Sequence, residues 1–324
     1  MKKYIGIDLG GTNIKAGIVD MDAGTVVANK SIPTLAREGH EAVMKRMADV
    51  ALNVVEEAKL TRDDIGGIGI GLPGVLDLDK GLTIFLPNLP GTWPNIPVRS
   101  VISEKTGLPV SILNDARAIT YGEWKFGAGR GVDTMACFTI GTGVGGGLVV
   151  NGKLHMGIGG TAGELGHQTI DYNGPRCGCG NNGCLEAFAS GPAIAAMGVK
   201  AVMQGITTNI GKIVNYDLNK ITPDVIAKAA SEGDATAQDI YQKVGVYFGI
   251  AIANVLVSVG PRKVVLGGGV AAAGELLFEP IRRTVRERVS VMPVDQVEIV
   301  PALLGNNAGV MGVASWANFK QMGD

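Results

Sequence analysis

The chain opens with Lys3-Tyr-Ile-Gly-Ile-Asp8-Leu-Gly-Gly-Thr12-Asn-Ile-Lys15-Ala-Gly-Ile-Val-Asp20, which is an apolar strand, a glycine-threonine turn and a second apolar strand. The same order returns at 134–151, where the turn is Gly141-Thr142-Gly143. Two such hairpins, each at the head of a long stretch of chain, indicate an internally duplicated fold. Strands that alternate with helices along the remainder place this fold in the α/β class.

Apolar runs and helical spacing predict the other elements. In the first part of the chain we expect strands at 26–30, 65–71 and 109–113, and helices at 37–59, 94–106 and 116–126. In the second part we expect strands at 262–266 and 296–301, and helices at 192–204, 222–231, 234–259, 276–288 and 307–319. The helix at 234–259 is long and apolar, so we expect it to be buried.

Length and composition restrict the class of protein. A chain of 324 residues, 46% of them hydrophobic, is long enough for two lobes with real cores. Its net charge is −1, and the lysines and arginines are scattered, which argues against a nucleic-acid or membrane surface. The first strand pattern begins at Lys3 and no apolar run looks long enough to span a bilayer, so we expect no signal peptide and a cytoplasmic protein.

Glycine is the compositional outlier. The chain has 49 glycines, which is twice the usual ~7%. They gather between strand-like runs, a distribution expected where backbone must approach a ligand closely. The glycines therefore predict ligand-binding turns and not a low-complexity linker.

The first hairpin has the groups of a phosphate site. Its two turn glycines leave backbone N–H groups able to point at an anion. Thr12 adds a hydroxyl and Lys15 a positive charge, while Asp8 could hold a hydrated Mg²⁺ beside phosphates. A plain β-hairpin is the alternative, and the repeat at Gly141 weighs against it.

The second hairpin matches the sequence pattern of a dinucleotide-binding site but not the secondary structure that such a site needs. Gly141-Thr-Gly-Val-Gly-Gly146 reads as Gly-x-Gly-x-x-Gly, but a strand follows it where a dinucleotide site needs a helix. We therefore expect no NAD, and the chain also has no ordinary P-loop sequence. Two glycine-threonine hairpins could instead clasp a triphosphate between two lobes. Gly267-Gly268-Gly269 would suit a base or ribose, although a tight strand-to-helix turn explains it as well.

A histidine and three cysteines gather between Glu164 and Glu186, in Glu164-Leu-Gly-His167 and Cys177-Gly-Cys179-Gly-Asn-Asn-Gly-Cys184-Leu-Glu186. Three thiolates and one imidazole are the set that zinc takes in a closed structural site. The alternatives are free thiols and disulfides, but three local cysteines leave one unpaired and nothing suggests secretion. The bends that bring the sulfurs together are predicted to use Gly178, Gly180 and Gly183.

Asn114 and Asp115 end a predicted strand, which is the usual place for ligand groups in an α/β sheet. A carboxylate there can accept the proton of an attacking hydroxyl, and the amide can donate to and accept from a polar substrate. The alternative is an Asx cap on the helix that begins at Ala116.

Together these motifs resemble the ROK family of sugar kinases and repressors, and within it the bacterial glucokinases. The resemblance extends through nearly the whole chain. It implies the actin-like ATPase fold of the hexokinase and heat-shock superfamily, an α/β fold with two duplicated βββαβα-type lobes and an active-site cleft. The implied domains are a smaller N-terminal lobe, 1–120 with 308–324, and a larger C-terminal lobe, 121–307, that contains the zinc knot.

The resemblance also implies roles for single positions. Asp115 matches the catalytic base. The positions that match sugar contacts are Gly74, Asn88, Asn114, Asp115, Glu164, His167 and Glu186. The positions that match the ATP site are Asp8, Gly11, Thr12, Lys15, Thr142, Gly143, Gly268 and Gly269. The positions that match the zinc ligands are His167, Cys177, Cys179 and Cys184.

The implied activity is transfer of phosphate from ATP to the C6 hydroxyl of a hexose, foremost glucose, with Mg²⁺ and a structural Zn²⁺. N-acetylmannosamine, mannose or fructose as the sugar and polyphosphate as the donor are alternatives, and a homodimer or homotetramer is expected. A sugar-sensing repressor is the alternative from another class. Repressors of the family carry an added N-terminal helix-turn-helix, and here the Asp8 motif begins too early for one.

Overall fold

The computed structural model describes residues 2–323, which divide into two compact units. Within that range the first unit contains residues 2–131, 153–163 and 303–323, and the second contains residues 132–152 and 164–302. Residues 121–131, 153–163 and 303–307, which we assigned to the second lobe, lie in the first unit. The two domains that the family resemblance implies stay a prediction.

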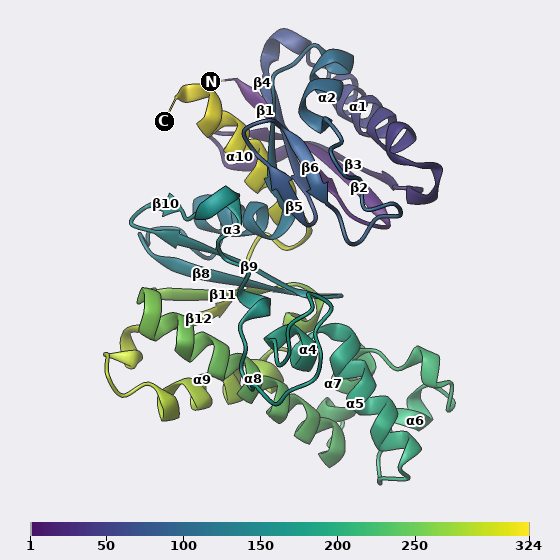
Figure 1. Ribbon diagram of the computed structural model, residues 1–324, viewed down its shortest axis with the longest axis vertical. Coiled ribbons are helices and arrows are strands. Elements are labelled where there is room, and N and C mark those ends of the chain that lie inside the picture. The colour runs from purple at the N-terminus through teal and green to yellow at the C-terminus, as the bar shows by residue number, and fades with distance from the viewer. Residues whose placement is uncertain (1, 324) are drawn as a thin grey trace. The chain divides into compact units, whose positions relative to one another are not determined.

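The first unit is built on a five-stranded sheet with the order β3-β2-β1-β4-β7 (Figure 1). Its strands β1, β4 and β7 are parallel, whereas β2 runs antiparallel to both β1 and β3. The bounds of the strands are β1 (Lys3–Leu9), β2 (Asn13–Asp20), β3 (Thr25–Pro33), β4 (Ile65–Leu72) and β7 (Val110–Asn114). All five were predicted, each within a few residues.

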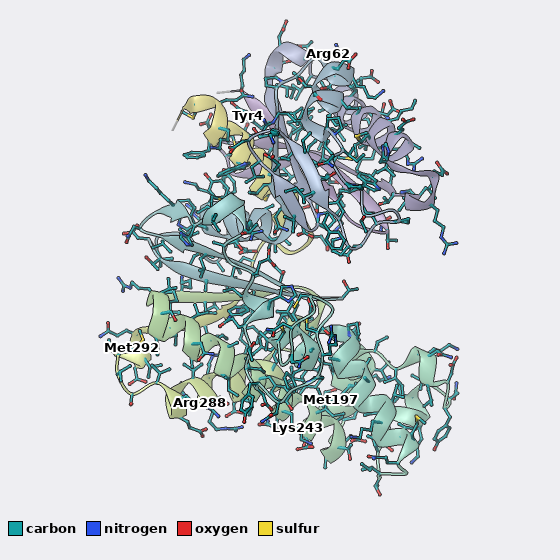
Figure 2. All side chains as sticks on the ribbon, viewed as in Figure 1. Tyr4, Arg62, Met197, Lys243, Arg288 and Met292 are labelled. Carbon is teal, nitrogen blue, oxygen red and sulfur yellow. The ribbon has the colours of Figure 1, made fainter. Side chains whose placement is uncertain are left out.

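Helices cover both faces of this sheet. Ile5, Ile7 and Leu9 alternate along β1 and face the cluster formed with α1 (His40–Glu57) and α2 (Val98–Thr106). On the other face Tyr4, which is labelled in Figure 2, is buried in a cluster with α10 (Ala308–Met322). The helix α3 (Asp115–Lys125) packs against α10, with the rings of Tyr121 and Trp316 5.7 Å apart and nearly perpendicular.

A small hairpin and several short helices complete the first unit. The hairpin consists of β5 (Val75–Asp77) and β6 (Leu82–Phe85), in a region where we predicted no strand, and its strands are too short to show a clear alternation. The remaining elements are β10 (Lys153–Leu154) and the 3₁₀ helices η1 (Ala36–Glu38), η2 (Arg62–Asp64), η3 (Ile158–Gly160) and η8 (Gly305–Asn307).

The second unit repeats the strand arrangement of the first. Its strands β8 (Met135–Ile140), β9 (Val144–Val150), β11 (Lys263–Gly267) and β12 (Glu298–Pro301) lie in the order β9-β8-β11-β12. β8 is antiparallel to β9 and parallel to β11, which is parallel to β12. These are the order and directions of β2-β1-β4-β7, so the predicted duplication is confirmed.

The helices of the second unit pack around one apolar core. In this core the rings of Phe138 on β8 and Phe248 on α8 meet at 6.1 Å and 84°. The helices are α4 (Leu185–Ala189), α5 (Gly191–Met203), α6 (Ile210–Ile213), α7 (Pro223–Ser231), α8 (Ala235–Val259) and α9 (Glu275–Arg288). Short 3₁₀ helices are η4 (Leu165–His167), η5 (Leu218–Lys220), η6 (Gly269–Ala273) and η7 (Val294–Gln296). The two shortest α-helices, α4 and α6, were not predicted.

The expectation that no apolar run is long enough to span a bilayer was wrong. Among the described residues α8 is long and apolar enough, by length and composition alone, to cross a membrane. Its residues Phe248, Ile252 and Leu256 are buried in the core of the second unit. The helix is therefore apolar because it is a core helix, as we predicted from its length and apolar character.

Glycines bring α10 unusually close to the sheet of the first unit. A Cβ placed on Gly69 of β4 would lie 1.8 Å from the carbonyl oxygen of Val313, and one on Gly6 of β1 would lie 2.0 Å from that of Val310. From the helix side, a Cβ on Gly312 would lie 1.8 Å from the carbonyl oxygen of Ala118 on α3. No side chain larger than hydrogen fits at these contacts, so they fix how deeply α10 is seated.

We therefore expect Gly69→Ala to lower the free energy of unfolding by roughly 2 kcal/mol or more, because the backbone of α10 must move to admit a methyl group. The matched control is Gly71→Ala in the same strand, where the added Cβ would meet its first neighbour at an ordinary 3.4 Å. Urea unfolding of both variants measures the difference. Equal losses for the two would contradict this account of the packing.

Candidate active site and metal cluster

The turn of the first hairpin is fixed by a residue 22 positions downstream. The buried Thr34 donates its hydroxyl to the carbonyl of Gly10 at 2.7 Å and its N–H to the carbonyl of Thr12 at 2.8 Å. Within the turn, the N–H of Gly10 donates to the carbonyl of Asn13 at 2.9 Å. Gly11 and Thr12 stay exposed at the tip. The sequence pointed to this turn but not to Thr34, because no local pattern reveals a contact over that separation.

Asp8 and Lys15 face each other across the same hairpin, as partners in the register of β1 and β2. The Asp8 carboxylate also faces the first turn of α10, where a Cβ on Gly309 would lie 2.9 Å from its Oδ2. Burial raises the pKa of Asp8, and the Lys15 ammonium opposes that rise in part. A carboxylate held in such a place is stabilised when a cation binds beside it.

Asn114 forms the cap that was the simpler interpretation of its position. Its Oδ1 accepts the N–H groups of Ala116 and Arg117 at 3.1 and 3.2 Å, which caps α3. Its Nδ2 donates to the carbonyl of Gly74 at 3.1 Å. Gly74 has φ +85° and no room for a Cβ, which would lie 2.2 Å from the carbonyl oxygen of Phe85. Two predicted sugar positions are thus joined by one hydrogen bond.

Asp115 follows this cap as the first residue of α3, at the carboxyl end of β7. Its Oδ1 accepts the N–H of Ala116 at 2.8 Å, and the residue is half-buried. The helix N-terminus favours a negative charge there. Asn88 is exposed, and its carbonyl oxygen lies 3.4 Å from where a Cβ on Gly11 would be. The loop of Asn88 therefore approaches the turn of the first hairpin.

The second hairpin has a comparable environment in the second unit. The N–H of Gly141 donates to the carbonyl of Gly143 at 2.9 Å, and Thr142 is exposed. Gly268 lies against the strand that leads into this turn, because a Cβ on it would be 2.3 Å from the carbonyl oxygen of Ile140. Gly269 then begins η6. The predicted phosphate and adenosine positions of this unit therefore lie at the same end of β8 and β11.

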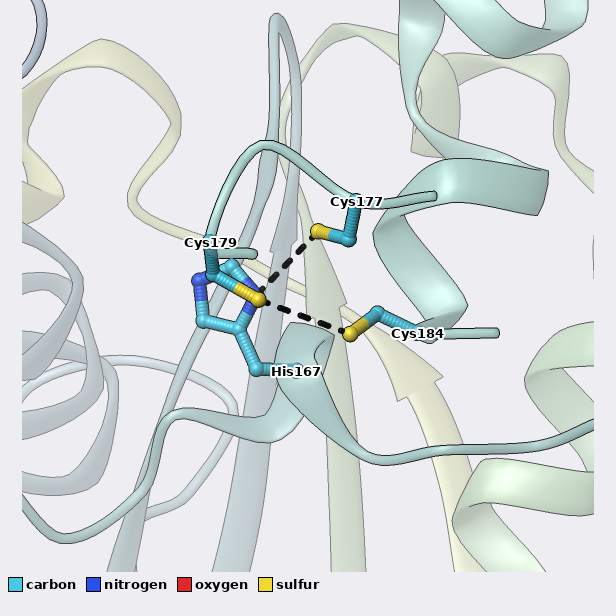
Figure 3. Close-up of side chains that lie close together, drawn as sticks. All are labelled: His167, Cys177, Cys179 and Cys184. Atoms are coloured by element: carbon cyan, nitrogen blue, oxygen red, sulfur yellow. Dashed lines mark hydrogen bonds between the residues drawn. The ribbon is translucent and has the colours of Figure 1, made fainter. Parts of the chain in front are cut away.

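His167, Cys177, Cys179 and Cys184 converge as predicted (Figure 3). Their ligand atoms all lie within 4.8 Å of one another. His167 Nδ1 is 3.7 Å from Cys177 Sγ, and the sulfurs of Cys179 and Cys184 are also 3.7 Å apart. Sulfurs at about 2.3 Å from a tetrahedral zinc are about 3.8 Å apart, whereas a disulfide needs about 2.05 Å. The spacing fits a metal site and excludes a disulfide in this arrangement.

The backbone of this metal cluster depends on two of its three glycines. Gly180 and Gly183 have φ of +94° and +70°, and a Cβ on Gly183 would lie 1.7 Å from the carbonyl oxygen of Asp171. Gly178 has neither a positive φ nor a close neighbour, so our assignment of a tight bend to it was wrong. An N–H of Cys177 donating to the carbonyl of Asn181 at 2.8 Å closes the turn.

All three cysteines can be thiolates at the same time only if a cation binds beside them. Burial raises the pKa of Cys184 to about 12 and also raises the pKa of Cys177. For Cys179 the N–H of Asn181 lowers the pKa. Metal binding requires deprotonated sulfur, so a dication would supply the charge that this buried environment lacks. All four ligands are protein groups, which is the arrangement of a closed structural site.

The metal cluster is attached to the second hairpin at two places. Glu186 Oε2 accepts the N–H of Val144 at 2.9 Å, while its Oε1 lies 3.8 Å from Cys177 Sγ. A Cβ on Gly166, in the turn of His167, would lie 1.8 Å from the carbonyl oxygen of Val144. The glycine between Glu164 and His167 thus serves close packing, and Glu186 has a structural partner besides any ligand.

The predicted residues fall into two groups. Within the first unit the structure gathers the first hairpin, the Asn88 loop, and Gly74 with Asn114 and Asp115. Within the second unit it gathers the metal cluster, Glu186 and the second hairpin, with Gly268 and Gly269 at the neighbouring strand end. Glu164 is exposed, and its carbonyl accepts the N–H of His167 at 3.0 Å. Ligand contacts of all these residues stay predictions.

The chain is similar to known proteins over nearly its whole length. The ROK family model matches residues 4–320. A glucokinase of Thermotoga maritima is 37% identical over 97% of this chain and 96% of its own length. A xylose repressor of Caldicellulosiruptor bescii is 34% identical over 95% of this chain but only 76% of its own. The crystal structure of a ROK family glucokinase from Streptomyces griseus in complex with glucose and AMPPNP has a TM-score of 0.84 and 31% identity, covering 98% and 99% of the two chains.

The burial of Asp8 predicts an effect on stability. Its pKa is raised in the folded state, so the folded chain holds this proton more tightly and stability from this group falls as pH rises above about 3.8. Asp8→Asn should therefore raise the melting temperature of the ligand-free protein by roughly 2 °C at pH 7, with the gain vanishing in acid. Asp20→Asn is the control, because hydrogen bonds lower the pKa of Asp20 and its loss should not stabilise. A melting temperature that falls for Asp8→Asn would contradict this interpretation.

The attachment of the metal cluster to the hairpin predicts a second effect. Cys179→Ser should abolish bound zinc, measured as metal per chain, and should speed amide hydrogen exchange at Val144, because Glu186 and Gly166 are no longer held. Cys137→Ala, at a buried cysteine of β8 outside the metal cluster, should change neither. Unchanged exchange at Val144 in a zinc-free variant would show that the metal does not support the hairpin.

Proposed function

This chain belongs to the ROK family, and on that premise we propose that it is an ATP-dependent hexose kinase that converts glucose to glucose 6-phosphate. The observation that carries the proposal is the placement of Asp115. A half-buried carboxylate stands at the start of α3, fixed by the Asn114 cap and its bond to Gly74. Two duplicated glycine-threonine hairpins, one in each unit, supply the phosphate-binding turns.

In this proposal Asp115 accepts the proton of the C6 hydroxyl as its oxygen attacks the γ-phosphoryl group of ATP. The oxygen–phosphorus bond to the sugar forms, the bond to ADP breaks, and the proton remains on the carboxylate until solvent removes it. Such transition states are loose, so most of the rate comes from positioning and from neutralising charge. The residues of this chain therefore act mainly by holding the two substrates.

The nucleotide is assigned to the hairpins. Backbone N–H groups around Gly11 and Gly143, the Thr12 and Thr142 hydroxyls and the Lys15 ammonium are suited to phosphate oxygens. Gly268 and Gly269 are suited to the adenosine because neither has a side chain. When bound, Mg²⁺ supplies charge neutralisation, and Asp8 would hold it through water. The bond of Thr34 to the first turn keeps Gly11 and Thr12 at the surface.

The sugar is assigned to Gly74, Asn88, Asn114 and Asp115 of the first unit and to Glu164, His167 and Glu186 of the second. A structural Zn²⁺ held by His167, Cys177, Cys179 and Cys184 would fix the tautomer of His167, because one ring nitrogen is committed to the metal. Zinc would thereby orient the imidazole without taking part in phosphoryl transfer.

Location and assembly belong to the same proposal. Thiols that serve as metal ligands and not as disulfides, together with ATP as a substrate, favour the cytoplasm. We expect a homodimer or homotetramer, and the depression on α4, α5 and α8 that Ala193, Met197 and Tyr247 line is a candidate contact between copies.

Asp115→Asn tests the activity. This variant keeps the size and the polar character of the side chain but not its basicity, so we expect kcat to fall by about 10²–10⁴-fold while both substrates still bind. A coupled assay of ADP release across glucose, mannose, fructose and N-acetylmannosamine measures turnover, with polyphosphate tested as donor. Wild type should favour glucose with ATP.

Two results would contradict the proposal. A variant that keeps more than a tenth of the wild-type kcat would show that Asp115 is not the base. A wild-type protein that binds sugar without releasing ADP would instead favour a sugar-sensing regulator, the other activity found among its relatives.

A further inference from the structure

The chain reaches Glu164 through a glycine-rich loop with hydrogen bonds of its own, such as that from the N–H of Ala162 to the carbonyl of Met156 at 2.9 Å. Residues 156–163 of this loop include Gly157, Gly159, Gly160 and Gly163, all with positive φ between 60° and 89°. Ile158 at its tip is 92% exposed. Three of its glycines line a cavity of about 730 Å³ in the first unit, so one side of the loop borders empty space. Glycine is the residue that loses most conformational freedom on ordering, so this loop needs an anchor.

Arg117 provides that anchor. Its side chain is only 2% exposed, and its Nε–H donates to the carbonyl of Ala162 at 2.7 Å. Its backbone N–H donates to Oδ1 of Asn114, so the residue is fixed on the same cap that presents Asp115. A guanidinium taken out of water is costly unless it is hydrogen-bonded, and its bonds are stronger than those between neutral groups. The anchored carbonyl is two residues before Glu164.

We propose that Arg117 is a positioning residue for the sugar: it holds the glycine loop 156–163 in the arrangement from which the chain continues into Glu164 and His167. The inference rests on the proposed function for the identity of the ligand. Without Arg117 the loop is ordered for only a fraction of the time, and the apparent sugar affinity falls by that fraction. Once sugar is bound the loop is ordered again, so turnover at saturation is preserved.

This role differs from that of a residue that positions the base. Loss of a group that held Asp115 would lower kcat and leave the KM for sugar unchanged, since the defect persists in the saturated enzyme. Loss of the loop anchor should raise the KM for sugar and leave kcat and the KM for ATP almost unchanged. The two kinetic constants therefore separate the two roles.

The experiment compares Arg117→Ala and Arg117→Lys with the control Arg282→Ala in the full-length protein. Arg282 also donates to a backbone carbonyl, that of Ile299, but in α9 of the second unit. Steady-state kinetics give the KM for glucose, the KM for ATP and kcat. Hydrogen exchange followed by mass spectrometry reports on residues 157–163 with and without glucose.

We expect both Arg117 variants to raise the KM for glucose about tenfold or more, with the lysine variant less affected because it keeps the buried positive charge. Amides of 157–163 should exchange faster in the ligand-free variants, and saturating glucose should restore their protection. Arg282→Ala should leave the loop and the KM for glucose as in wild type.

Unchanged loop exchange in the Arg117 variants, or equal rises in KM for glucose and ATP, would overturn the proposal. Exchange in the ligand-free protein tests the anchor even if the proposed activity fails, so the two failures are distinguishable. If neither variant folds, the wild-type protein provides the test of the anchor. Glucose should slow exchange of the Arg117 Nε–H and of the loop amides together in NMR spectra, and a lack of this joint effect would equally sink the idea.

Discussion

Close contact between backbones, possible only where glycine stands, is the constraint on which this structure depends. In the first unit Gly69 and Gly312 let α10 touch β4 and α3 at distances that no side chain would allow. In the second unit Gly166 does the same between the turn of His167 and Val144. Because both partners at such a contact are backbone, there is little room for adjustment, and the groups that these segments carry are positioned with little freedom.

Charge is the second constraint, and it is concentrated at strand ends. Asp8 lies half-buried between Lys15 and the first turn of α10, and Asp115 stands at the N-terminus of α3. In the metal cluster Cys177 and Cys184 are buried, and burial raises the pKa of both thiols. Each place suits a bound cation or a transferred proton, which is what a kinase that handles ATP, a metal and a hydroxyl requires.

Several residues with structural partners connect these places. Glu186 joins the metal cluster to the second hairpin, and Thr34 fixes the first. Arg117 joins the helix of Asp115 to the loop before Glu164. Phosphoryl transfer depends on positioning more than on covalent chemistry, so residues like these matter as much as those that touch substrate. A metal bound by the cluster would be one more positioning device, because it would hold an imidazole and, through the cluster, support the hairpin, and its four ligands would all be protein groups.

The sequence by itself determined the main strands of the two large sheets, the long helices, the duplicated hairpins and the four candidate metal ligands, because each rests on a local period or on near neighbours in the chain. It also identified Asn114 and Asp115 through their place at a strand end, although it left open that Asn114 would serve as a cap. Only the tertiary structure decided that Glu186 accepts from Val144, that Gly166 packs on the same residue, and that Arg117 anchors Ala162. These contacts join residues that are 22, 42 and 45 positions apart in the chain. No local pattern encodes which distant backbone group will meet a given residue.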